Sequence, residues 1–486
     1  MDRNLTALKP ALVWKHFAEI VRIPRPSHHE EAIRRYVLDF ARSLGLEASE
    51  DEAHNVLVRK PASKGLENRK GVILQAHLDM VPQKNNDKTF DFLTDPIDAY
   101  IDGEWVTADG TTLGADNGIG VAAGILAVLE DDTLVHGPLE ALFTATEETG
   151  MDGAFGLQPG VLRGEILLNL DSETEGELYV GCAGGLDANM TLPYGEEPTP
   201  AAGYAAARLT VKGLKGGHSG IQIVCQRANA NKVLFRFLNA APCELLLCSV
   251  DGGGLRNAIP REAEAVVLVP EAGYAAFAEA VAAYEKTIQE EFAGIEDGVS
   301  IRVEPCARPE RMLPREAAMR LIRAVVGCPD GVQRMSMAMP GLVQTSSNLA
   351  RVVSDGSAVK MQSLLRSSVR SEKFALGEAI TAVFALAGAT TELTGAYDGW
   401  NPDMQSPILK AMTASYEALY GRKPAVTAIH AGLECGIIGG KYPGLDMISF
   451  GPTISYPHSP DEKVEIASVA KFYDFLVHTL RNVPEK

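Results

Sequence analysis

Five residues of types that bind transition metals occur in short, unusual contexts spread along the chain. The contexts are QAHLDM (75–80), GADNGIG (114–120), TATEETG (144–150), LNLDSE (168–173) and SYPHSPDE (455–462), and the candidates in them are His77, Asp116, Glu148, Asp171 and His458. Imidazole nitrogen suits zinc, and carboxylate oxygens can bridge a pair of ions. Two ions about 3.5–4 Å apart activate water and polarise a carbonyl or phosphoryl oxygen. The pattern therefore predicts a metal-dependent hydrolase with two zinc-like ions.

His77 and Asp79 stand two residues apart at the end of an expected strand, so both side chains lie on one face of it. His77 can bind a metal there while Asp79 accepts its other N–H, which fixes the tautomer and the ring orientation. The alternative is an aspartate that caps a turn beside an unrelated histidine.

Each acidic candidate could also have a purely structural role. Glycines around Asp116 let the backbone approach a ligand and its carboxylate could bridge two ions, although Asp is also a common helix N-cap. The adjacent Glu147 and Glu148 repel each other unless a cation or proton intervenes, so one can bind metal while the other takes a proton from water. They could instead form a solvated acidic turn. Asp171 ends the very apolar segment ILLNLD, where a capping role is the alternative.

His458 lies between Pro457 and Pro460, whose restricted φ angles would fix its direction. A single loop histidine is ordinarily unremarkable. It gains weight here because the five contexts occur together in one chain.

Size and composition limit the class of protein. A chain of 486 residues exceeds one ordinary core, which predicts two or more domains. Its 46% hydrophobic and 22% charged residues are typical of a soluble globular protein, and the net charge of −18 argues against nucleic acid or an anionic membrane as partner. We expect no signal peptide and no membrane span, since no apolar run approaches roughly 20 residues. Seven dispersed cysteines without a CxxC pair fit a reducing compartment, the cytoplasm.

The two ends of the chain share one pattern, in which short apolar strands alternate with amphipathic helices. Strands are expected at 71–77, 138–148, 164–171, 425–431 and 445–451, and helices at 29–44, 116–130, 406–420 and 466–482. This alternation predicts an α/β sheet covered on both faces, with ligands at the carboxyl ends of its strands.

The middle of the chain differs. From about residue 205 the expected order is βαββαβ, which is typical of a ferredoxin-like sandwich, and a similar order nearly recurs over 314–398. We therefore predict a catalytic domain of residues 1–183 and 399–486. Residues 184–398 are predicted to be an inserted α+β lid of two tandem ferredoxin-like subdomains. Lids exclude water and complete sites.

The ordered set HLD, GADNGIG, EE, NLD and PHS resembles the M20 family of di-zinc metallopeptidases. The lid, with GGHSG (216–220) and HAGLECG (430–436), is most similar to the branch that contains aminoacyl-histidine and non-specific dipeptidases. The resemblance covers essentially the whole chain. It implies a zinc-peptidase-like α/β/α sandwich with an inserted lid.

The resemblance also implies two Zn²⁺ ions per chain, for which Co²⁺ or Mn²⁺ can substitute. His77, Asp116 and Asp171 would hold one ion, while Asp116, Glu148 and His458 would hold the other. Glu147 would then be the general base and Asp79 the orienting acid. The implied reaction is attack of a metal-bridging hydroxide on a peptide carbonyl.

Five further residues are candidates for substrate contacts. In relatives a lid histidine stabilises the oxyanion, a role that His218 could fill in cis or in trans, unless it is a turn histidine. Arg366 could bind the substrate C-terminal carboxylate bidentately, or be a surface arginine. Asn257, His430 and Glu434 are further candidates. Glu434 could meet a free α-amino group or merely neighbour a helix cap.

The resemblance therefore predicts a metal-dependent dipeptidase that hydrolyses unblocked dipeptides, including Xaa-His types such as carnosine. The alternatives are another M20 hydrolase, either a tripeptidase or an N-acyl-amino-acid deacylase, and a non-catalytic binding protein on the same fold. The sequence leaves open the preferred dipeptide, the native metal and whether the chain forms a homodimer.

Overall fold

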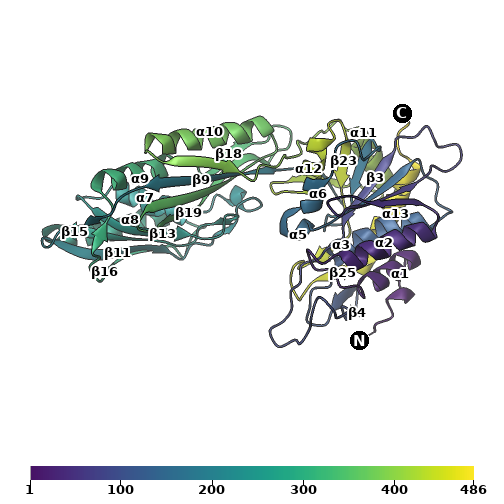
Figure 1. Ribbon diagram of the computed structural model, residues 1–486, viewed down its shortest axis with the longest axis horizontal. Helices are drawn as coiled ribbons and strands as arrows, with labels where there is room; N and C mark the ends of the chain where they lie inside the picture. The colour runs from purple at the N-terminus through teal and green to yellow at the C-terminus, as the bar shows by residue number, and fades with distance from the viewer. Residues whose placement is uncertain (1) are drawn as a thin grey trace. The chain divides into compact units, whose positions relative to one another are not determined.

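The computed structural model describes residues 2–486, except the side chains of 123 and 124. The chain divides into two compact units (Figure 1). The first contains the residues up to Cys182, Trp400–Ala428 and Leu433–Lys486, and the second contains Ala183–Gly399 and Ile429–Gly432. Residues 429–432, which the sequence placed in the catalytic domain, thus group with the second unit. The roles of catalytic domain and lid stay predictions.

The first unit is built on a mixed sheet in the order β1-β2-β6-β3-β7-β23-β8-β22. The four central strands run parallel to one another in the order β6, β3, β7 and β23. The antiparallel pairs are β1 with β2, β2 with β6, and β8 with β23. Every residue of β3, β6 and β7 is buried, so the sheet needs cover on both faces. The strands are β1 (Glu47–Glu50), β2 (Val56–Lys60), β3 (Val72–His77), β6 (Leu139–Thr144), β7 (Ile166–Asn169), β8 (Glu177–Cys182), β22 (Ala425–Ile429) and β23 (Asp446–Ser449).

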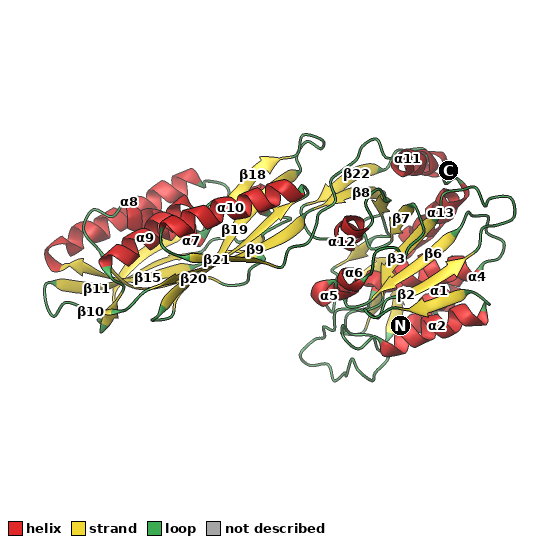
Figure 2. Cartoon of the chain, turned by 45° about the horizontal axis from the view of Figure 1, so that its top comes forward, coloured by secondary structure: helices red, strands yellow, loops and turns green. Residues whose placement is uncertain are grey.

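Helices cover both faces of this sheet, which confirms the predicted α/β/α class (Figure 2). α1 and α13 pack against η2, while α12 packs against α6 and contacts β23 and β8. The helical elements are η1 (Leu5–Ala7), α1 (Ala11–Ile20), α2 (Glu31–Ser43), α3 (Ala115–Ile119), η2 (Gly120–Leu126), α4 (Ala127–Glu130), α5 (Glu147–Gly150), α6 (Asp152–Gly156), α11 (Pro407–Tyr420), α12 (Glu434–Lys441) and α13 (Ile466–Arg481).

The predicted helix 116–130 is interrupted twice. Asp116 and Asn117 have non-helical φ and ψ angles inside α3, and η2 winds as a π-helix before α4. Single π-helical turns are frequent at functional sites. The predicted strand 138–148 is also shorter, because β6 ends at Thr144 and Glu147 begins α5.

A second, small sheet in this unit was not predicted. Its order is β24-β25-β5-β4, formed by β24 (Ile454–Ser455), β25 (Lys463–Glu465), β5 (Trp105–Ala108) and β4 (Ala99–Asp102). β25 pairs antiparallel with β5, with Lys463 opposite Thr107. The loop 456–462 connects β24 to β25, and the segment 109–114 leads from β5 to α3. The small sheet therefore brings the His458 loop beside the start of α3.

The second unit has one continuous sheet in the order β16-β11-β15-β13-β19-β20-β9-β21, with β18 paired to β19. The expected βαββαβ order is present as β11, α7, β13, β15, α8 and β16. The two ferredoxin-like halves join where β13 pairs with β19, and α7, α8, α9 and α10 lie on one face over a shared core (Figure 2). Because β9 belongs to the second half but precedes the first in sequence, the halves are nested within one sheet.

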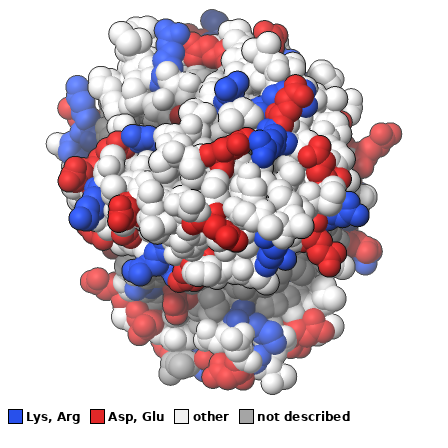
Figure 3. Space-filling model, turned by 90° about the vertical axis from the view of Figure 1, so that its left-hand side faces the viewer, with Lys and Arg blue, Asp and Glu red and all other residues white. Residues whose placement is uncertain are grey.

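The elements of this unit are β9 (Gly184–Pro193), β10 (Glu197–Pro198), β11 (Tyr204–Lys212), β12 (Gly217–His218), η3 (Ile223–Cys225), α7 (Ala230–Asn239), β13 (Leu246–Gly253), β14 (Ala258–Ile259), β15 (Ala263–Pro270), η4 (Glu271–Gly273), α8 (Tyr274–Glu291), β16 (Ser300–Pro305), β17 (Arg311–Met312), α9 (Arg315–Gly327), β18 (Gly331–Met335), β19 (Val343–Ser354), β20 (Ala358–Ser367), α10 (Arg370–Leu386) and β21 (Thr390–Thr394). Acidic and basic side chains are interspersed on the face drawn in Figure 3. Within residues 2–486, no helix has the length and apolar character needed to cross a bilayer.

Candidate active site

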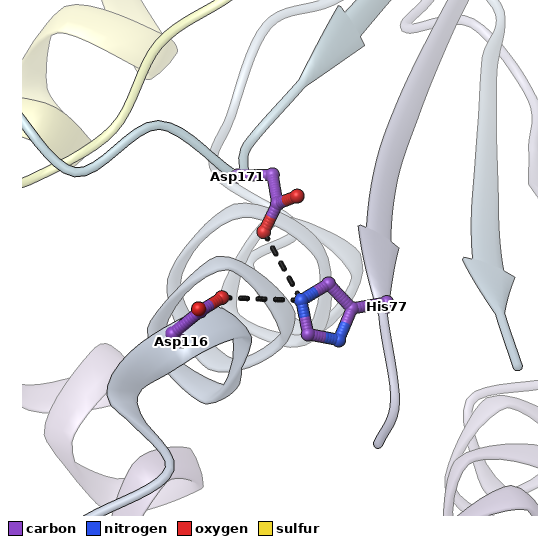
Figure 4. Close-up of side chains that lie close together, drawn as sticks. All are labelled: His77, Asp116 and Asp171. Carbon is purple, nitrogen blue, oxygen red and sulfur yellow. Dashed lines mark hydrogen bonds and ion pairs between the residues drawn. The ribbon is translucent and has the colours of Figure 1, made fainter. Parts of the chain in front are cut away.

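Three predicted ligands meet at the carboxyl ends of β3 and β7 and at the start of α3 (Figure 4). Nε2 of His77 lies 3.1 Å from Oδ1 of Asp116 and 3.2 Å from Oδ1 of Asp171. The His77 side chain is 1% exposed, and those of Asp116 and Asp171 are 10% and 9% exposed. Residues from three separate segments thus point their polar atoms at one place.

Asp116 also takes part in a second group. Nε2 of His458 lies 3.1 Å from Oδ2 of Asp116 and 3.0 Å from Oε2 of Glu148. The two oxygens of Asp116 therefore face two different histidines. In each of the two groups the potential ligand atoms lie within 4.8 Å of one another. The structure thus brings together all five predicted ligands, including His458 from the far end of the chain.

The electrostatics of the site fit a pair of cations. Burial lowers the pKa of His77, but Asp171 and Asp116 outweigh it and hold that pKa well above its ordinary value. Hydrogen bonds with Asp116 and Glu148 raise the pKa of His458 to about 11, and burial raises the pKa of Asp171 to about 6. Oε1 of Glu148 is buried and has no hydrogen-bond partner among the residues that the structure describes. Divalent ions would supply the positive charge that these crowded carboxylates require, and imidazole with carboxylate oxygen is a donor set that zinc accepts.

Asp79 links His77 to the loop that carries the glutamate pair. Its Oδ1 lies 3.3 Å from Nδ1 of His77 and accepts the N–H of Glu147 at 2.9 Å. Its Oδ2 accepts the N–H of Glu148 at 3.1 Å and the hydroxyl of Ser27 at 2.8 Å. Burial opposes ionisation, but His77 and these donors lower the pKa of Asp79 to about 2. Asp79 is therefore an ionised acid that holds both the imidazole and the backbone of α5.

Glu147 begins α5, directly after Thr146, which has a positive φ of 55°. The buried Glu30 stabilises this turn by accepting the N–H and hydroxyl of Thr146 at 3.0 and 2.7 Å. Burial raises the pKa of Glu147 well above its ordinary value, and the negative charges of Asp171 and Glu434 raise it further. The positive charge of His77 lowers this pKa but does not outweigh them. A carboxyl with a raised pKa that lies beside metal ligands suits proton transfer near neutral pH.

Glu434, at the start of α12, is 1% exposed and lies in the first unit near the same residues. Its Oε2 accepts hydrogen bonds from Nε2 of Gln75 at 2.6 Å and from the hydroxyl of Thr144 at 2.8 Å. Oε1 has no partner among the described residues. Gln75 is oriented in turn by Asn169, whose Nδ2 donates to its Oε1 at 2.5 Å. The result is a buried acid with one oxygen held and one free.

The predicted lid residues form a polar cluster within the second unit. Arg366, on β20, is 5% exposed, and no ion-pair partner for it is found in the part of the chain that the structure describes. Burial and then Arg366 lower the pKa of His218, and the same two causes lower the pKa of His430 to about 3. Nε2 of His430 is 2.7 Å from the hydroxyl of Ser346. This cluster holds two neutral imidazoles beside an unpaired guanidinium.

The hydrogen bonds of His218 determine its tautomer. Its Nδ1 accepts the N–H groups of Gly220 and Ile221 at 3.2 and 3.1 Å, so the proton of the neutral ring belongs on Nε2. The exposed Asn257 contributes through its backbone, since its carbonyl accepts the N–H of Ser219 at 2.8 Å. Asn348, which the sequence did not single out, donates to the carbonyls on both sides of Asn257.

Comparison with known proteins agrees with this geometry. Residues 73–482 match the family described as Peptidase family M20/M25/M40. The chain belongs to the M20 family. It is 47% identical over 485 residues to the cytosol non-specific dipeptidase of Escherichia coli, covering 99% of this chain and all of the relative.

Solved structures are similar to this chain over its whole length. The aminoacylhistidine dipeptidase of Vibrio alginolyticus is 48% identical with a TM-score of 0.94, covering 99% of each chain. The aminopeptidase PepT of Bacillus cereus shares the fold, with a TM-score of 0.58, 16% identity and coverage of 98% of this chain and 99% of that one. The predicted family and fold class are thus confirmed.

Several charged residues that support this M20 site escaped the sequence analysis. Glu30, Arg25 and Glu462 are all buried and bond to the backbone of the loops that carry the predicted ligands. Only Glu462 lies inside a motif that was singled out, SYPHSPDE. A charged residue in a polar loop gives no signal of burial, because its partners come from distant segments.

Proposed function

We propose that this chain is a metal-dependent dipeptidase that hydrolyses unblocked dipeptides, Xaa-His peptides such as carnosine among them. The observation that carries the proposal is Asp116, whose two oxygens face His77 and His458 within two overlapping groups of ligand atoms. Its support from relatives is the full-length similarity to two proteins whose names state dipeptidase activity.

His77, Asp116 and Asp171 would hold one divalent cation, and Asp116, Glu148 and His458 the other. When bound, a pair of zinc ions, or of cobalt or manganese, lowers the pKa of water and polarises the scissile carbonyl. Glu147 would take the proton of the attacking water and return it to the leaving amine. Asp79 would hold His77 and the Glu147 backbone in place during both transfers.

The second unit would act as a lid that recognises the substrate. The Nε2–H of His218 is a donor for the oxyanion that develops as the carbonyl is attacked. Arg366, a buried guanidinium with no anionic partner in the described residues, suits the C-terminal carboxylate of a dipeptide. His430 and Asn257 would make further contacts with the substrate, and Glu434 of the first unit would receive the α-ammonium group.

The cytoplasm is the compartment we propose. The cysteines of the described chain are all free thiols, and the Escherichia coli relative carries the word cytosol in its name.

The test combines metal removal with a choice of substrate. Exhaustive chelation should abolish dipeptide hydrolysis, and zinc, cobalt or manganese should restore it. The unblocked dipeptide should be cleaved in preference to its N-acetylated form and to a tripeptide. Activity that survives chelation would refute the metal mechanism, and preference for the N-acetylated form would favour a deacylase. A chain that binds no zinc at all would favour a non-catalytic protein.

A further inference from the structure

Glu462 makes an unusual set of contacts with the segment that leads into α3. Its Oε2 accepts the N–H groups of Leu113 and Gly114 at 2.8 and 2.9 Å, and its Oε1 accepts those of Ala115 and Asp116 at 2.7 and 3.2 Å. The residue is 2% exposed. Four N–H donors therefore converge on the two oxygens of one side chain, two on each oxygen.

The same segment is held from its other side by Arg25, which is 1% exposed. Its guanidinium donates to the carbonyls of Leu78 and Asp79 at 2.8 and 2.7 Å and also to the carbonyl of Gly114. Gly114 has a φ of 71°, and a Cβ there would lie 2.6 Å from the guanidinium, so only glycine fits. The backbone just before Asp116 is therefore clamped between a buried acid and a buried base.

Glu462 reaches this segment from the loop that carries His458, four residues earlier in the chain. β25 follows at once, and the hydroxyl of Thr107 on β5 donates to the carbonyl of Glu462 at 2.8 Å. His458 and Asp116 are 342 residues apart in sequence. The Glu462 carboxylate thus joins the segment of Asp116 to the loop of His458, the two segments whose side chains would bind the same ion.

We propose that Glu462 is a positioning residue of the metal centre, which ties the Asp116 segment to the His458 loop so that their side chains are arranged before the ion binds. The inference rests on the metal-binding roles proposed for Asp116 and His458. Without the carboxylate, the ion would have to order both segments itself, and its affinity would fall.

The experiment measures metal affinity, not turnover. Metal-free wild type, Glu462→Gln and Glu462→Asp would be titrated with Zn²⁺ and with Co²⁺ against a chromophoric chelator. Glutamine keeps the size of the side chain, but its NH₂ group meets two of the N–H donors. We expect at least one of the two ions to bind about 10- to 100-fold more weakly to Glu462→Gln, the usual cost of losing support for metal ligands.

Glu140 supplies the matched control. It is 6% exposed at the start of β6, and its Oε2 accepts the N–H groups of Arg163 and Gly164 at 2.7 and 2.8 Å. Its contacts lie at the end of the strand away from the ligands. Glu140→Gln should lower the melting temperature and leave both metal affinities unchanged.

The proposal is overturned if Glu462→Gln loses stability as Glu140→Gln does and yet binds both ions with wild-type affinity. If Glu462→Gln does not fold, Glu462→Asp decides by the same titration, and failure of both to fold would make Glu462 a folding residue and reject the proposal. Wild type that binds two ions but cleaves no dipeptide would refute the proposed substrate and leave this comparison intact. Wild type that binds neither ion would refute the metal centre itself.

Discussion

The two units gather opposite kinds of polar group. In the first, the carboxylates of Asp171 just after β7, Asp116 in α3 and Glu148 in α5 crowd around His77 and His458, and burial keeps them from water. In the second, Arg366 lies beside His218 and His430, whose pKa values are lowered and which are therefore neutral at neutral pH. The first cluster is short of positive charge, whereas Arg366 in the second forms no ion pair among the described residues.

This difference indicates that the two units would bind oppositely charged groups of one substrate. A site rich in carboxylates attracts metal ions and an ammonium group, whereas a buried guanidinium with donor imidazoles attracts a carboxylate and an oxyanion. An unblocked dipeptide has one ammonium and one carboxylate, so under the proposed function each kind of site would have a partner on it. Substitutions in the two units should therefore change different kinetic and binding constants.

The largest effect of a single substitution is expected for Glu147→Ala in the first unit. Loss of the proposed general base should lower kcat by about 100- to 10,000-fold, the usual contribution of a positioned group that transfers the proton. Metal content, measured by elemental analysis after zinc loading, should stay near the wild-type value. Loss of an ion together with activity would show instead that Glu147 is a ligand. Glu19→Ala, in α1, is the control and should leave both kcat and metal content unchanged.

The sequence was sufficient to predict which residues of this unit come together at the candidate metal site, for a physical reason. β3, β6 and β7 are buried throughout and mostly apolar, and an ionisable group at the carboxyl end of such a strand stands out. Parallel strands bring those ends to one edge of the sheet. His77 and Asp171 follow that rule directly, and Glu148 follows it one turn later.

Other parts depend on contacts that no local pattern records. β24 and β25 have two and three residues, too few to show a period, so the small sheet that delivers His458 was not predicted. The helical period over 116–130 could not reveal that Asp116 itself has non-helical angles. Arg25 and Glu462 look like ordinary loop charges until folding surrounds them with backbone groups.

In the second unit the largest effect is expected for His218→Leu. Removal of one oxyanion donor typically lowers kcat by about 100- to 1,000-fold, and KM should change little because the donor acts on charge that develops in the transition state. Steady-state kinetics on one dipeptide measures both constants. A large rise in KM with unchanged kcat would assign His218 to ground-state binding and contradict this role.

Arg366→Met should weaken recognition of the substrate carboxylate instead. Hydrogen bonds to charged groups contribute about 1.5–3 kcal/mol, so kcat/KM for a dipeptide should fall roughly 10- to 100-fold. Against a dipeptide amide, which lacks the carboxylate, wild type and variant should be nearly equal. Arg351→Met is the matched control, because Arg351, on β19, is paired with Asp251. Equal losses on the acid and the amide would mean that Arg366 only supports the fold.

Glu434→Gln should have the smallest effect and the most selective one. The change keeps the size of the side chain and one acceptor oxygen, but it removes the negative charge that would face the α-ammonium group. We expect a competitive inhibitor with a free α-amino group to bind about tenfold more weakly, within the range for hydrogen bonds to charged groups. Its des-amino analogue should bind equally to wild type and variant. Inhibition constants for the pair measure this, and a parallel loss for both inhibitors would place Glu434 among the residues that only hold Gln75 and Thr144.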